Sequence, residues 1–483
     1  MKYYITTPIY YVNAKPHIAH AYTTLIADVL ARYLRLKGKK VFFLTGTDEH
    51  GAKVAQKAQE FGKNPQEFCD QVAGQFEKAW LNLDITFDSF IRTTSELHKK
   101  GVVKMIKQLK ENGDIYKADY EGFYCTGCEK FLTQKELIDG KCADHQVEPE
   151  LIREKNYFFK LSKYTGVIKE KVKKDELLVR PQKRKNEIIS LLDTNLEDFS
   201  ISRESVEWGI DVPFDKTQKI YVWVEALMNY ISALDYGKQG RQAGKFKKFW
   251  PADLHLIGKD ITKFHIIYWP AILLSLKLPL PKQVFAHGYF TINGEKMSKT
   301  IGNVIDPNDL VEKWGKDATR YLILNQFPVG EDGDISLEKL EAQYKANLAN
   351  DLGNLLQRVL VMMNKFEVKD KAFKIDPYKH QDLDFQKEFD FDLDGFLNFM
   401  DNLKIFKAIK KIDKYISQSN KYIEANKPWE LAKTDKIQCQ KVLITLYRRL
   451  ILVARLIKPF MPDISKEMLN QLESGEPKPL FKK

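Results

Sequence analysis

The sequence has no long apolar run, no leader-like start and no repeat. No stretch reaches about 18 consecutive apolar residues, so we expect no membrane-spanning helix. The opening MKYYITTPIY alternates as a strand does and lacks the basic head and apolar core of a secretory leader. Internal repeats and low-complexity tails are also absent. These absences argue against membrane, secreted and fibrous proteins and favour a globular chain.

Cysteine is scarce and odd in number. Five cysteines occur, and Cys125, Cys128 and Cys142 fall close together. This usage argues against a disulfide framework and favours a reducing compartment, so we expect a cytoplasmic location. The other two, Cys69 and Cys439, fall in helical patterns, where buried packing is their expected role.

The chain is rich in apolar and charged residues. Of its 483 residues, 44% are apolar and 29% are charged, so sizeable cores can form, and the length suggests two to four domains. The formal net charge is +12. A positive surplus favours a polyanionic partner, although a lysine-rich chain can be basic for other reasons.

Alternating strand and helix patterns open the chain. Residues 2–11 alternate as a strand, residues 18–37 have helical apolar spacing, and 41–44 is a short apolar strand. Gly38 stands where a glycine commonly ends a helix. This rhythm predicts a parallel sheet that binds ligands at the carboxyl ends of its strands.

The rhythm stops over 116–205 and then resumes. We expect further strands at 219–224, 253–258 and 283–292, so an insertion splits one parallel-sheet domain. From about residue 338 strand patterns vanish, and long amphipathic patterns predict a helical bundle.

Two motifs suited to phosphate lie far apart in the chain. His17 and His20 (HIAH) stand where the first strand leads into a helix, whose N-terminus offers free N–H groups to phosphate. Lys296 and Lys299 (KMSK) follow a predicted strand, and a mobile pair of lysines suits a triphosphate. Taken alone, the histidine pair could equally be two ordinary surface histidines, and a lone lysine motif of this kind is more often a solvated basic loop.

The clustered cysteines have the spacing of a zinc knuckle. Cys125, Cys128, Cys142 and His145 form a CxxC and a CxxH, separated by a compact loop. Four protein ligands would fill a tetrahedral site, so a structural zinc is predicted rather than a catalytic one. The alternative is reduced, unmetallated thiols beside an incidental histidine.

Six segments together resemble methionyl-tRNA synthetases, a class I aminoacyl-tRNA synthetase family whose HIGH and KMSKS motifs embrace ATP. They occur in the family's order: TPIYYVNAKPHIAHAYT (7–23), FLTGTDEHGAK (43–53), DFSISR (198–203), YVWVEALMNYI (221–231), GKDITKFHIIYWPA (258–271) and AHGYFTINGEKMSKT (286–300). The resemblance implies an α/β fold with a Rossmann-like parallel sheet, split by a zinc-bearing insertion and followed by an all-α anticodon-binding bundle. One branch of the family carries a single knuckle of this kind.

The domain boundaries that follow are predictions. They are 1–115 for the first half of the catalytic domain, 116–205 for the connective insertion with the zinc knuckle, 206–295 for the second half, 296–338 for the lysine loop and stem-contact region, and 339–483 for the anticodon-binding domain.

The resemblance also implies the activity and its ligands. The family joins methionine to ATP, releasing pyrophosphate, and then moves the methionyl group to tRNA, with Mg²⁺ accompanying ATP. No nucleophilic side chain is needed, because positioning and charge stabilisation carry the reaction. The positions that match the family's ATP site are His17, His20, Gly258, Asp260, His287, Gly288, Phe290, Lys296 and Lys299.

The matching methionine site combines aromatic residues with one carboxylate. A thioether packs favourably against aromatic rings, and Asp48 matches the carboxylate that holds the substrate ammonium. Without the resemblance, aromatic residues in strands and helices are more often ordinary core. The remaining positions are Ile9, Tyr11, Trp223, Ala226, Tyr230, Phe264, His265 and Trp269.

Two residues depart from the family motifs. Ala19 replaces the glycine of HIGH, where the nucleotide lies against the backbone, so ATP affinity is the property in question. Thr300 replaces the last serine of KMSKS and keeps the hydroxyl. We expect activity to be retained.

The resemblance assigns the helical tail to the anticodon. Asn350, Asn354 and Arg358 recur at intervals of four and so share a helix face, while Trp429 offers a stacking plane. Each asparagine could equally belong to a solvated face. The chain ends soon after the bundle and lacks the extra C-terminal module of some relatives, so we expect a monomer with no obligate protein partner.

Two other functions remain open at this point. A sister class I synthetase for leucine, isoleucine, valine or cysteine would share the histidine and lysine motifs, but not the YVWVEALMNY and GKDITKFH segments. A catalytically silent tRNA-binding protein would explain Ala19, but the retained histidines and lysines argue against it.

Overall fold

The computed structural model describes residues 1–127, 129–132, 137–143, 146–236, 244–296, 303–370, 376–379 and 389–482. The chain divides into two compact units. The first unit comprises Met1–Pro16, Val41–Lys78 and Phe87–His287, and the second comprises His17–Lys40, Ala79–Thr86 and Gly288–Lys483.

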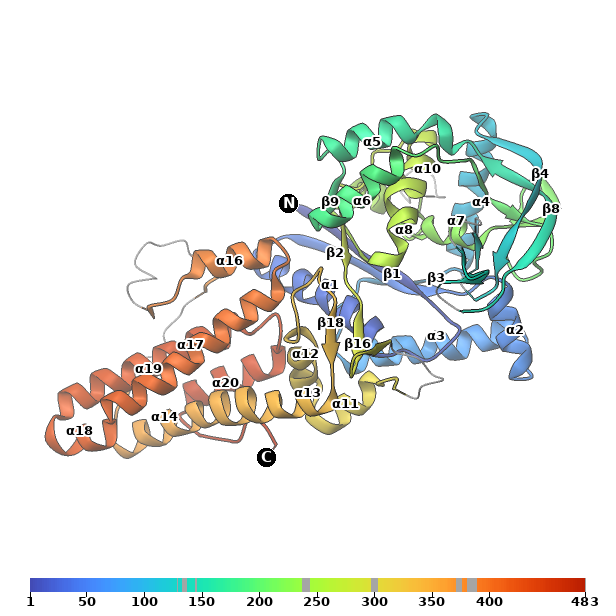
Figure 1. Cartoon of the computed structure of the whole chain (residues 1–483). Helices are drawn as coiled ribbons and strands as arrows, with labels where there is room; N and C mark the ends of the chain where they lie inside the picture. The colour runs from blue at the N-terminus through green and yellow to red at the C-terminus, as the bar shows by residue number, and fades with distance from the viewer. Residues whose placement is uncertain are drawn as a thin grey trace. The chain divides into compact units, whose positions relative to one another are not determined.

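The first unit is an α/β domain built around a parallel sheet (Figure 1). Its elements are β1 (Lys2–Tyr11), β2 (Lys40–Asp48), α2 (Ala52–Glu60), α3 (Pro65–Asn82, whose last turn belongs to the second unit), β3 (Ser89–Arg92), α4 (Glu96–Glu111), β4 (Ile115–Cys125), β5 (Lys130–Leu132), β6 (Leu137–Ile138), β7 (Lys141–Cys142), β8 (Glu150–Phe159), η2 (Leu161–Lys163), α5 (Thr165–Lys173), β9 (Leu178–Arg180), α6 (Gln182–Leu192), β10 (Phe199–Ser200), β11 (Ser202–Arg203), β12 (Asp211–Val212), β13 (Asp215–Ile220), α7 (Val222–Leu227), α8 (Asn229–Ser232), α9 (Gly244–Phe249), β14 (Leu254–Gly258), η4 (Lys259–Ile261), η5 (Phe264–Tyr268), α10 (Trp269–Ser275) and β15 (Gln283–His287).

The main sheet has the strand order β3-β2-β1-β14-β15-β9. The pairs β2–β3, β1–β14, β14–β15 and β15–β9 are all parallel, which confirms the predicted parallel sheet. β1 pairs with β14, a strand about half the chain away, because both are apolar and buried on both faces, as strands of a parallel sheet must be. The carboxyl ends of β1, β2, β14 and β15 therefore meet at one edge of the sheet.

Two of the predicted strands are wrong in part. The strand expected at 219–224 ends at Ile220 in β13, which pairs antiparallel in a small separate sheet, and the chain continues as helix α7. Alternation in YVWV resembles a strand, yet these side chains pack as a helical turn against the main core. The strand expected at 283–292 is two strands, β15 in the main sheet and β16 in another, separated by Gly288 and Tyr289.

The range predicted as an insertion is mostly antiparallel. β4 and β8 form a long ladder from Ile115–Phe159 to Tyr124–Glu150, and β10 and β5 complete a four-stranded sheet. β6 and β7 form a short hairpin. β9, from the same range, pairs with β15 at the edge of the main sheet, so this part of the chain is joined to the parallel sheet by backbone hydrogen bonds.

The second unit is mainly helical (Figure 1). Its elements are α1 (Ile18–Leu36), β16 (Phe290–Ile292), β17 (Glu295–Lys296), α11 (Pro307–Trp314), α12 (Lys316–Leu324), β18 (Gly333–Ile335), α13 (Leu337–Gln343), η6 (Tyr344–Gly353), α14 (Asn354–Lys365), α16 (Leu393–Asp401), α17 (Ile405–Asn426), α18 (Pro428–Thr434), α19 (Lys436–Leu456) and α20 (Pro462–Ser474). Beyond β18 the described residues contain no strand, which confirms the predicted helical bundle.

The bundle helices have apolar stripes that pack on one another. α17 buries Ile405, Ile409, Ile412 and Ile416, a spacing that places them on one face of the helix. α19 contacts α14, α17, α18 and α20, and buries leucines along its whole length. Burial of these stripes supplies the stability that short isolated helices lack.

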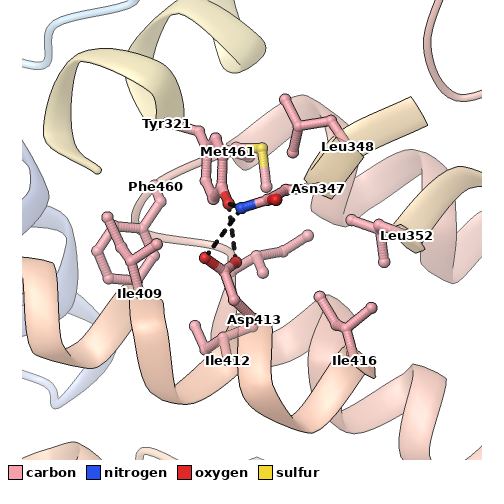
Figure 2. Close-up of a pocket in the computed structure, with 11 residues that line it drawn as sticks. Tyr321, Asn347, Leu348, Leu352, Ile409, Ile412, Asp413, Ile416, Phe460 and Met461 are labelled. Atoms are coloured by element: carbon pink, nitrogen blue, oxygen red, sulfur yellow. Dashed lines mark hydrogen bonds between the residues drawn. The ribbon is translucent and has the colours of Figure 1, made fainter. Parts of the chain in front are cut away.

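A π-helical segment, η6, precedes α14 in the bundle. Next to it, Figure 2 shows the Asp413 carboxylate of α17 directed at Tyr321 and Asn347, which donate hydrogen bonds of 2.8 and 3.3 Å. The surrounding side chains are aliphatic or aromatic, and burial raises the pKa of Asp413. The cavity at this point measures about 10 Å³, which holds no more than a single water.

None of the described helices combines the length and apolar character needed to cross a bilayer.

Candidate active site and metal knuckle

Three residues predicted to bind ATP meet at the carboxyl edge of the main sheet. Gly258 ends β14 and is paired in register with His287, which ends β15. Asp260 follows in the short η4 turn and is exposed. A side chain at position 258 would place its Cβ 2.5 Å from an Asp260 carboxylate oxygen and would displace that carboxylate, so glycine here leaves Asp260 its place. A parallel sheet binds ligands at this edge.

The two histidines lie together at the start of α1. His17 is the N-cap residue and His20 is in the first turn. Their rings stack with centroids 3.7 Å apart, and the His17 backbone N–H donates to His20 Nδ1 at 3.3 Å. Burial and the neighbouring His17 hold the pKa of His20 well below its usual value, so His20 is neutral with its proton on Nε2. That N–H can donate to an anion.

Ile305, which follows the KMSK motif in the sequence, contacts the start of the same helix. Lys296 lies in β17, whereas Lys299 and the rest of the KMSK motif lie outside the described residues. The Ile18 backbone N–H, the first of α1, donates to Ile305 O at 3.0 Å.

The remaining two ATP positions also belong to the second unit. Gly288 begins this unit, and Phe290 begins β16. The Phe290 ring packs edge-on against Tyr22 of α1, with centroids 5.8 Å apart. Its side chain is therefore committed to the core, and its backbone is the part that a base could contact.

Most of the predicted methionine-binding residues form one aromatic cluster in the first unit. Trp223 stacks on Phe264 with ring centroids 4.1 Å apart, and Trp269 lies 6.1 Å from Tyr230. Ile9 and Tyr11 pack against the same core, and Ala226 is buried on α7. We call Ile9, Tyr11, Trp223, Ala226, Tyr230, Phe264, His265 and Trp269 the aromatic cluster.

Tyr230 and His265 carry the polar groups of this cluster. His265 Nδ1 donates to Ile261 O at 3.0 Å, so Nε2 is an acceptor and receives the Tyr230 hydroxyl proton at 2.6 Å. Burial lowers the pKa of His265 to about 4, which keeps the ring neutral. His265 lies in the π-helical turn η5, a distortion that is frequent at functional sites.

Asp48 is buried beside three other carboxylates. It ends β2, and its Oδ1 accepts no hydrogen bond from the described residues. Burial, followed by the charges of Glu225, Glu129 and Glu49, raises the pKa of Asp48 well above its usual value. An unsatisfied buried carboxylate oxygen in such a negative environment favours a cationic ligand.

The three neighbours of Asp48 each have partners of their own. Glu225 accepts from His50 at 2.8 Å and from His98 at 2.6 Å; these histidines outweigh its burial and lower its pKa to about 2. Glu49 pairs with Arg92, whose Nε lies 2.7 Å away. Glu129 accepts from two tyrosines, as described below. Among these four carboxylates, Asp48 is thus the one with an oxygen that accepts no hydrogen bond from the described residues.

Sequence reasoning assigned no role to Glu129, Glu225 or Arg203. The segments DFSISR and YVWVEALMNYI contain two of them, but apolar and aromatic patterns drew attention to other positions. Arg203 pairs with Glu154 at 2.9 Å, and its guanidinium carbon lies 4.0 Å from the centroid of the Tyr124 ring. The sequence signals that could have identified the two glutamates are an acid directly after a metal-ligand motif, as for Glu129, and an acid directly before a pocket residue, as for Glu225.

Two of the four predicted zinc ligands lie within the described residues. Cys125 ends β4 and Cys142 ends β7, and both are buried in one small cluster with Leu132. Cys128 and His145 lie outside the described residues. Cys142 also makes two backbone hydrogen bonds: Gln146 N–H donates to its carbonyl oxygen, and its own N–H donates to Val147 O. Two thiols from two hairpins therefore lie in one small core. Such a core buries few apolar residues, and a structural metal would stabilise it.

Of the four predicted anticodon residues, two are in contact. The Arg358 guanidinium carbon lies 5.9 Å from the centre of the Trp429 ring, and Arg358 pairs with Glu424 at 2.6 Å. Asn350 is exposed in η6, and Asn354 is half-buried at the start of α14. Both asparagines precede Arg358 along one continuous helical segment.

Two protein-family profiles match this chain. A family profile described as "tRNA synthetases class I (M)" matches residues 3–148 and 132–360, and one described as "Anticodon binding domain of methionyl tRNA ligase" matches residues 375–479. The fold is thus that of a class I tRNA synthetase.

Relatives and solved structures agree on the family. The chain is 45% identical to the methionine--tRNA ligase of Thermotoga maritima over 99% of this chain and 76% of that one. It is also 45% identical to the enzyme of Caldanaerobacter subterraneus, over 97% of this chain and 74% of that one. The Mycobacterium tuberculosis methionyl-tRNA synthetase in complex with methionyl-adenylate has a TM-score of 0.91 at 35% identity, with 100% of both chains covered. The chain belongs to the methionyl-tRNA synthetase family.

Proposed function

We propose that this chain is a methionine--tRNA ligase, which activates L-methionine with ATP and transfers the methionyl group to the 3′ end of tRNA(Met). The observation that carries the proposal is the aromatic cluster next to Asp48. Aromatic rings pack favourably against a thioether sulfur, and the open Asp48 oxygen can pair with an ammonium group. The two features together suit an amino acid with a thioether side chain.

The aromatic cluster would hold the methionine side chain. Trp223, Phe264 and Trp269 offer ring surface, and the neutral His265 keeps the Tyr230 hydroxyl directed at its Nε2. A branched acid such as isoleucine has no sulfur and a different shape, so its discrimination would rest on packing alone. Asp48 would accept the ammonium group and so fix the orientation of the α-carbon.

The ATP residues divide into two sets with different tasks. Gly258, Asp260 and His287 line the sheet edge, where Asp260 would accept hydrogen bonds from ribose hydroxyls. His20 and the N-terminus of α1 would donate to phosphate oxygens, and the lysines of the KMSK loop would neutralise the departing pyrophosphate. Mg²⁺ would arrive with the triphosphate.

In the first step the methionine carboxylate attacks the α-phosphate of ATP. A bond forms between a carboxylate oxygen and the α-phosphorus, the bond to the bridging oxygen breaks, and pyrophosphate leaves. In the second step a hydroxyl of the terminal ribose of tRNA attacks the activated carbonyl and AMP leaves. The protein contributes positioning and charge and forms no covalent bond.

We further propose a structural zinc ion held by Cys125, Cys128, Cys142 and His145. When bound, it would cross-link the β4–β5 turn to the β6–β7 hairpin and take no part in the reaction. The burial of Cys125 and Cys142 in one cluster supports this assignment. The monomeric state and the cytoplasmic location stay predictions from the sequence.

Methionine-dependent exchange of pyrophosphate into ATP tests the activity. We expect exchange with methionine, none above background with leucine, isoleucine, valine or cysteine, and none with methionine in the Asp48→Asn variant. Exchange with another amino acid would indicate a sister synthetase. Absence of exchange with any amino acid, together with retained tRNA binding, would indicate the silent tRNA-binding protein instead.

A further inference from the structure

We propose that Glu129 is a positioning residue for the amino-acid substrate. It fixes the Tyr11 side chain beside Asp48 and joins the cysteine-bearing hairpin to this site. The inference rests on the proposed function and adds a residue to it. It follows from the contacts of Glu129, from the constraint on its backbone and from its charge.

The Glu129 carboxylate is fully engaged. Its Oε1 accepts from the Tyr11 hydroxyl at 2.9 Å and from the Lys53 backbone N–H at 2.7 Å, and its Oε2 accepts from the Tyr124 hydroxyl at 2.6 Å. These donors come from β1, α2 and β4, so a single side chain that is 3% exposed connects three elements. A glutamine has one acceptor oxygen and cannot serve all three donors in the same way.

The backbone of Glu129 is held in an uncommon conformation. Its φ is 52°, in the left-handed region that residues other than glycine seldom adopt. The Tyr221 hydroxyl donates to its carbonyl oxygen at 2.5 Å, and the Lys53 ammonium donates to the carbonyl oxygen of Gly127. Such a conformation persists where the surroundings determine it, and it is frequent at functional sites.

The turn after Asp48 is shaped to receive this carboxylate. Gly51 has a φ of 110°, and a Cβ at this position would lie 2.6 Å from Glu129 Oε1 and 3.0 Å from the Tyr11 hydroxyl. Any residue larger than glycine would push Glu129 away from Tyr11. Glu129 therefore lies against the chain three residues beyond Asp48, although it belongs to the hairpin that carries the cysteines.

Glu129 also contributes charge to the site. Its carboxylate is one of the three that raise the pKa of Asp48, so it belongs to the negative field in which the open Asp48 oxygen lies. Loss of this charge would weaken the attraction for the substrate ammonium. Loss of the hydrogen bond would release Tyr11, a member of the aromatic cluster. Both effects act on methionine, and neither acts on ATP.

Exchange kinetics of the full chain with Glu129→Gln test the role. The substitution preserves shape and removes the charge. We expect the KM for methionine to rise about tenfold or more, the size of a lost charge-assisted hydrogen bond, with the KM for ATP unchanged. The matched control is Glu121→Gln, on an exposed part of β4 where Glu121 pairs with Arg153, and it should behave as wild type.

A double-variant cycle and a second variant make the test specific. Tyr11→Phe combined with Glu129→Gln should raise the KM for methionine by less than the product of the single effects, because both remove the same hydrogen bond. Glu129→Asp keeps the charge but shortens the reach, so its KM for methionine should lie between those of wild type and Glu129→Gln. Should Glu129→Gln fail to fold, Glu129→Asp still gives the comparison of the two KM values.

Two results would overturn the inference. One is a KM for methionine within about twofold of wild type in Glu129→Gln. The other is a parallel rise in the KM values for methionine and ATP, which would assign Glu129 a purely structural role. Failure of the proposed function has a separate signature, since the wild-type chain itself would then show no methionine-dependent exchange.

Discussion

Arg320 and Asp28 form an ion pair whose side chains are both completely buried, with 2.7 Å between Arg320 Nη2 and an Asp28 carboxylate oxygen. Arg320 also donates to the backbone carbonyls of Leu83, Pro459 and Phe460. The pair therefore joins α12 to α1, the helix that begins with the two histidines, and to the turn that precedes α20. All of these segments belong to the second unit.

Asp28→Asn should destabilise the protein strongly, because it leaves the buried Arg320 guanidinium without its counter-charge. Loss of one partner of a buried pair costs about 3–5 kcal/mol, so the free energy of unfolding should fall by this amount in urea titrations followed by circular dichroism. As a control, Arg153→Gln removes an exposed pair with Glu121 and should leave the unfolding curve unchanged. An unchanged curve for Asp28→Asn would contradict the prediction.

Methionine affinity should fall as the pH is lowered through the raised pKa of Asp48. Burial and the neighbouring carboxylates favour the protonated form of Asp48, whose pKa lies well above the ordinary value of 3.8. Asp48 therefore loses the negative charge that attracts the ammonium group at a higher pH than an ordinary aspartate would. His265 stays neutral until its pKa of about 4 and adds nothing at higher pH. Equilibrium dialysis without ATP, from about pH 8 to about pH 5, measures the effect.

An analogue without the amino group, 4-(methylthio)butanoate, is the control for this pH dependence. It has no ammonium to pair with Asp48, so its weaker binding should not decrease with falling pH over the same range. A methionine affinity with the same pH dependence as that of the analogue would argue against Asp48 as the ammonium partner.

Removal of the proposed zinc should affect the hairpins of the first unit. Elemental analysis of the purified chain should find stoichiometric zinc, and Cys142→Ser should lower the zinc content together with the melting temperature, since a small metal knuckle folds around its ion. Cys439→Ala is the matched control, because Cys439 is buried on α19 and donates to Pro428 O. Wild-type protein without zinc, or equal zinc content in both variants, would refute the metal assignment.

Trp429→Ala should weaken tRNA use without affecting the formation of the adenylate. Loss of one base-stacking plane costs about 1–3 kcal/mol, so kcat/KM for tRNA(Met) should fall about 5- to 150-fold while methionine-dependent exchange stays at the wild-type rate. Phe61→Ala, at an aromatic side chain that is 66% exposed just after the end of α2, should change neither measurement. A parallel loss of exchange activity would show that Trp429 acts through the fold.

The helix α1 and the strands β1, β2 and β14 could be predicted from the sequence because each has an unambiguous apolar period. Residues 219–224 could not, because YVWV alternates as a strand does while its side chains pack as a helical turn. The division of 283–292 into β15 and β16 likewise depends on which sheet each half joins, and pairing partners leave no local pattern.

The site shows the same division. The paired histidines, the lysine loop, the cysteine spacing and the aromatic segments are short-range patterns, so residue type and spacing alone determined them. The carboxylates around Asp48 were decided by the tertiary structure. Glu225 meets His50 across 175 positions, and Glu129 meets Tyr11 across 118. Such contacts arise only when strands and hairpins pack, because a buried charge gains its partners from whichever elements the fold brings beside it.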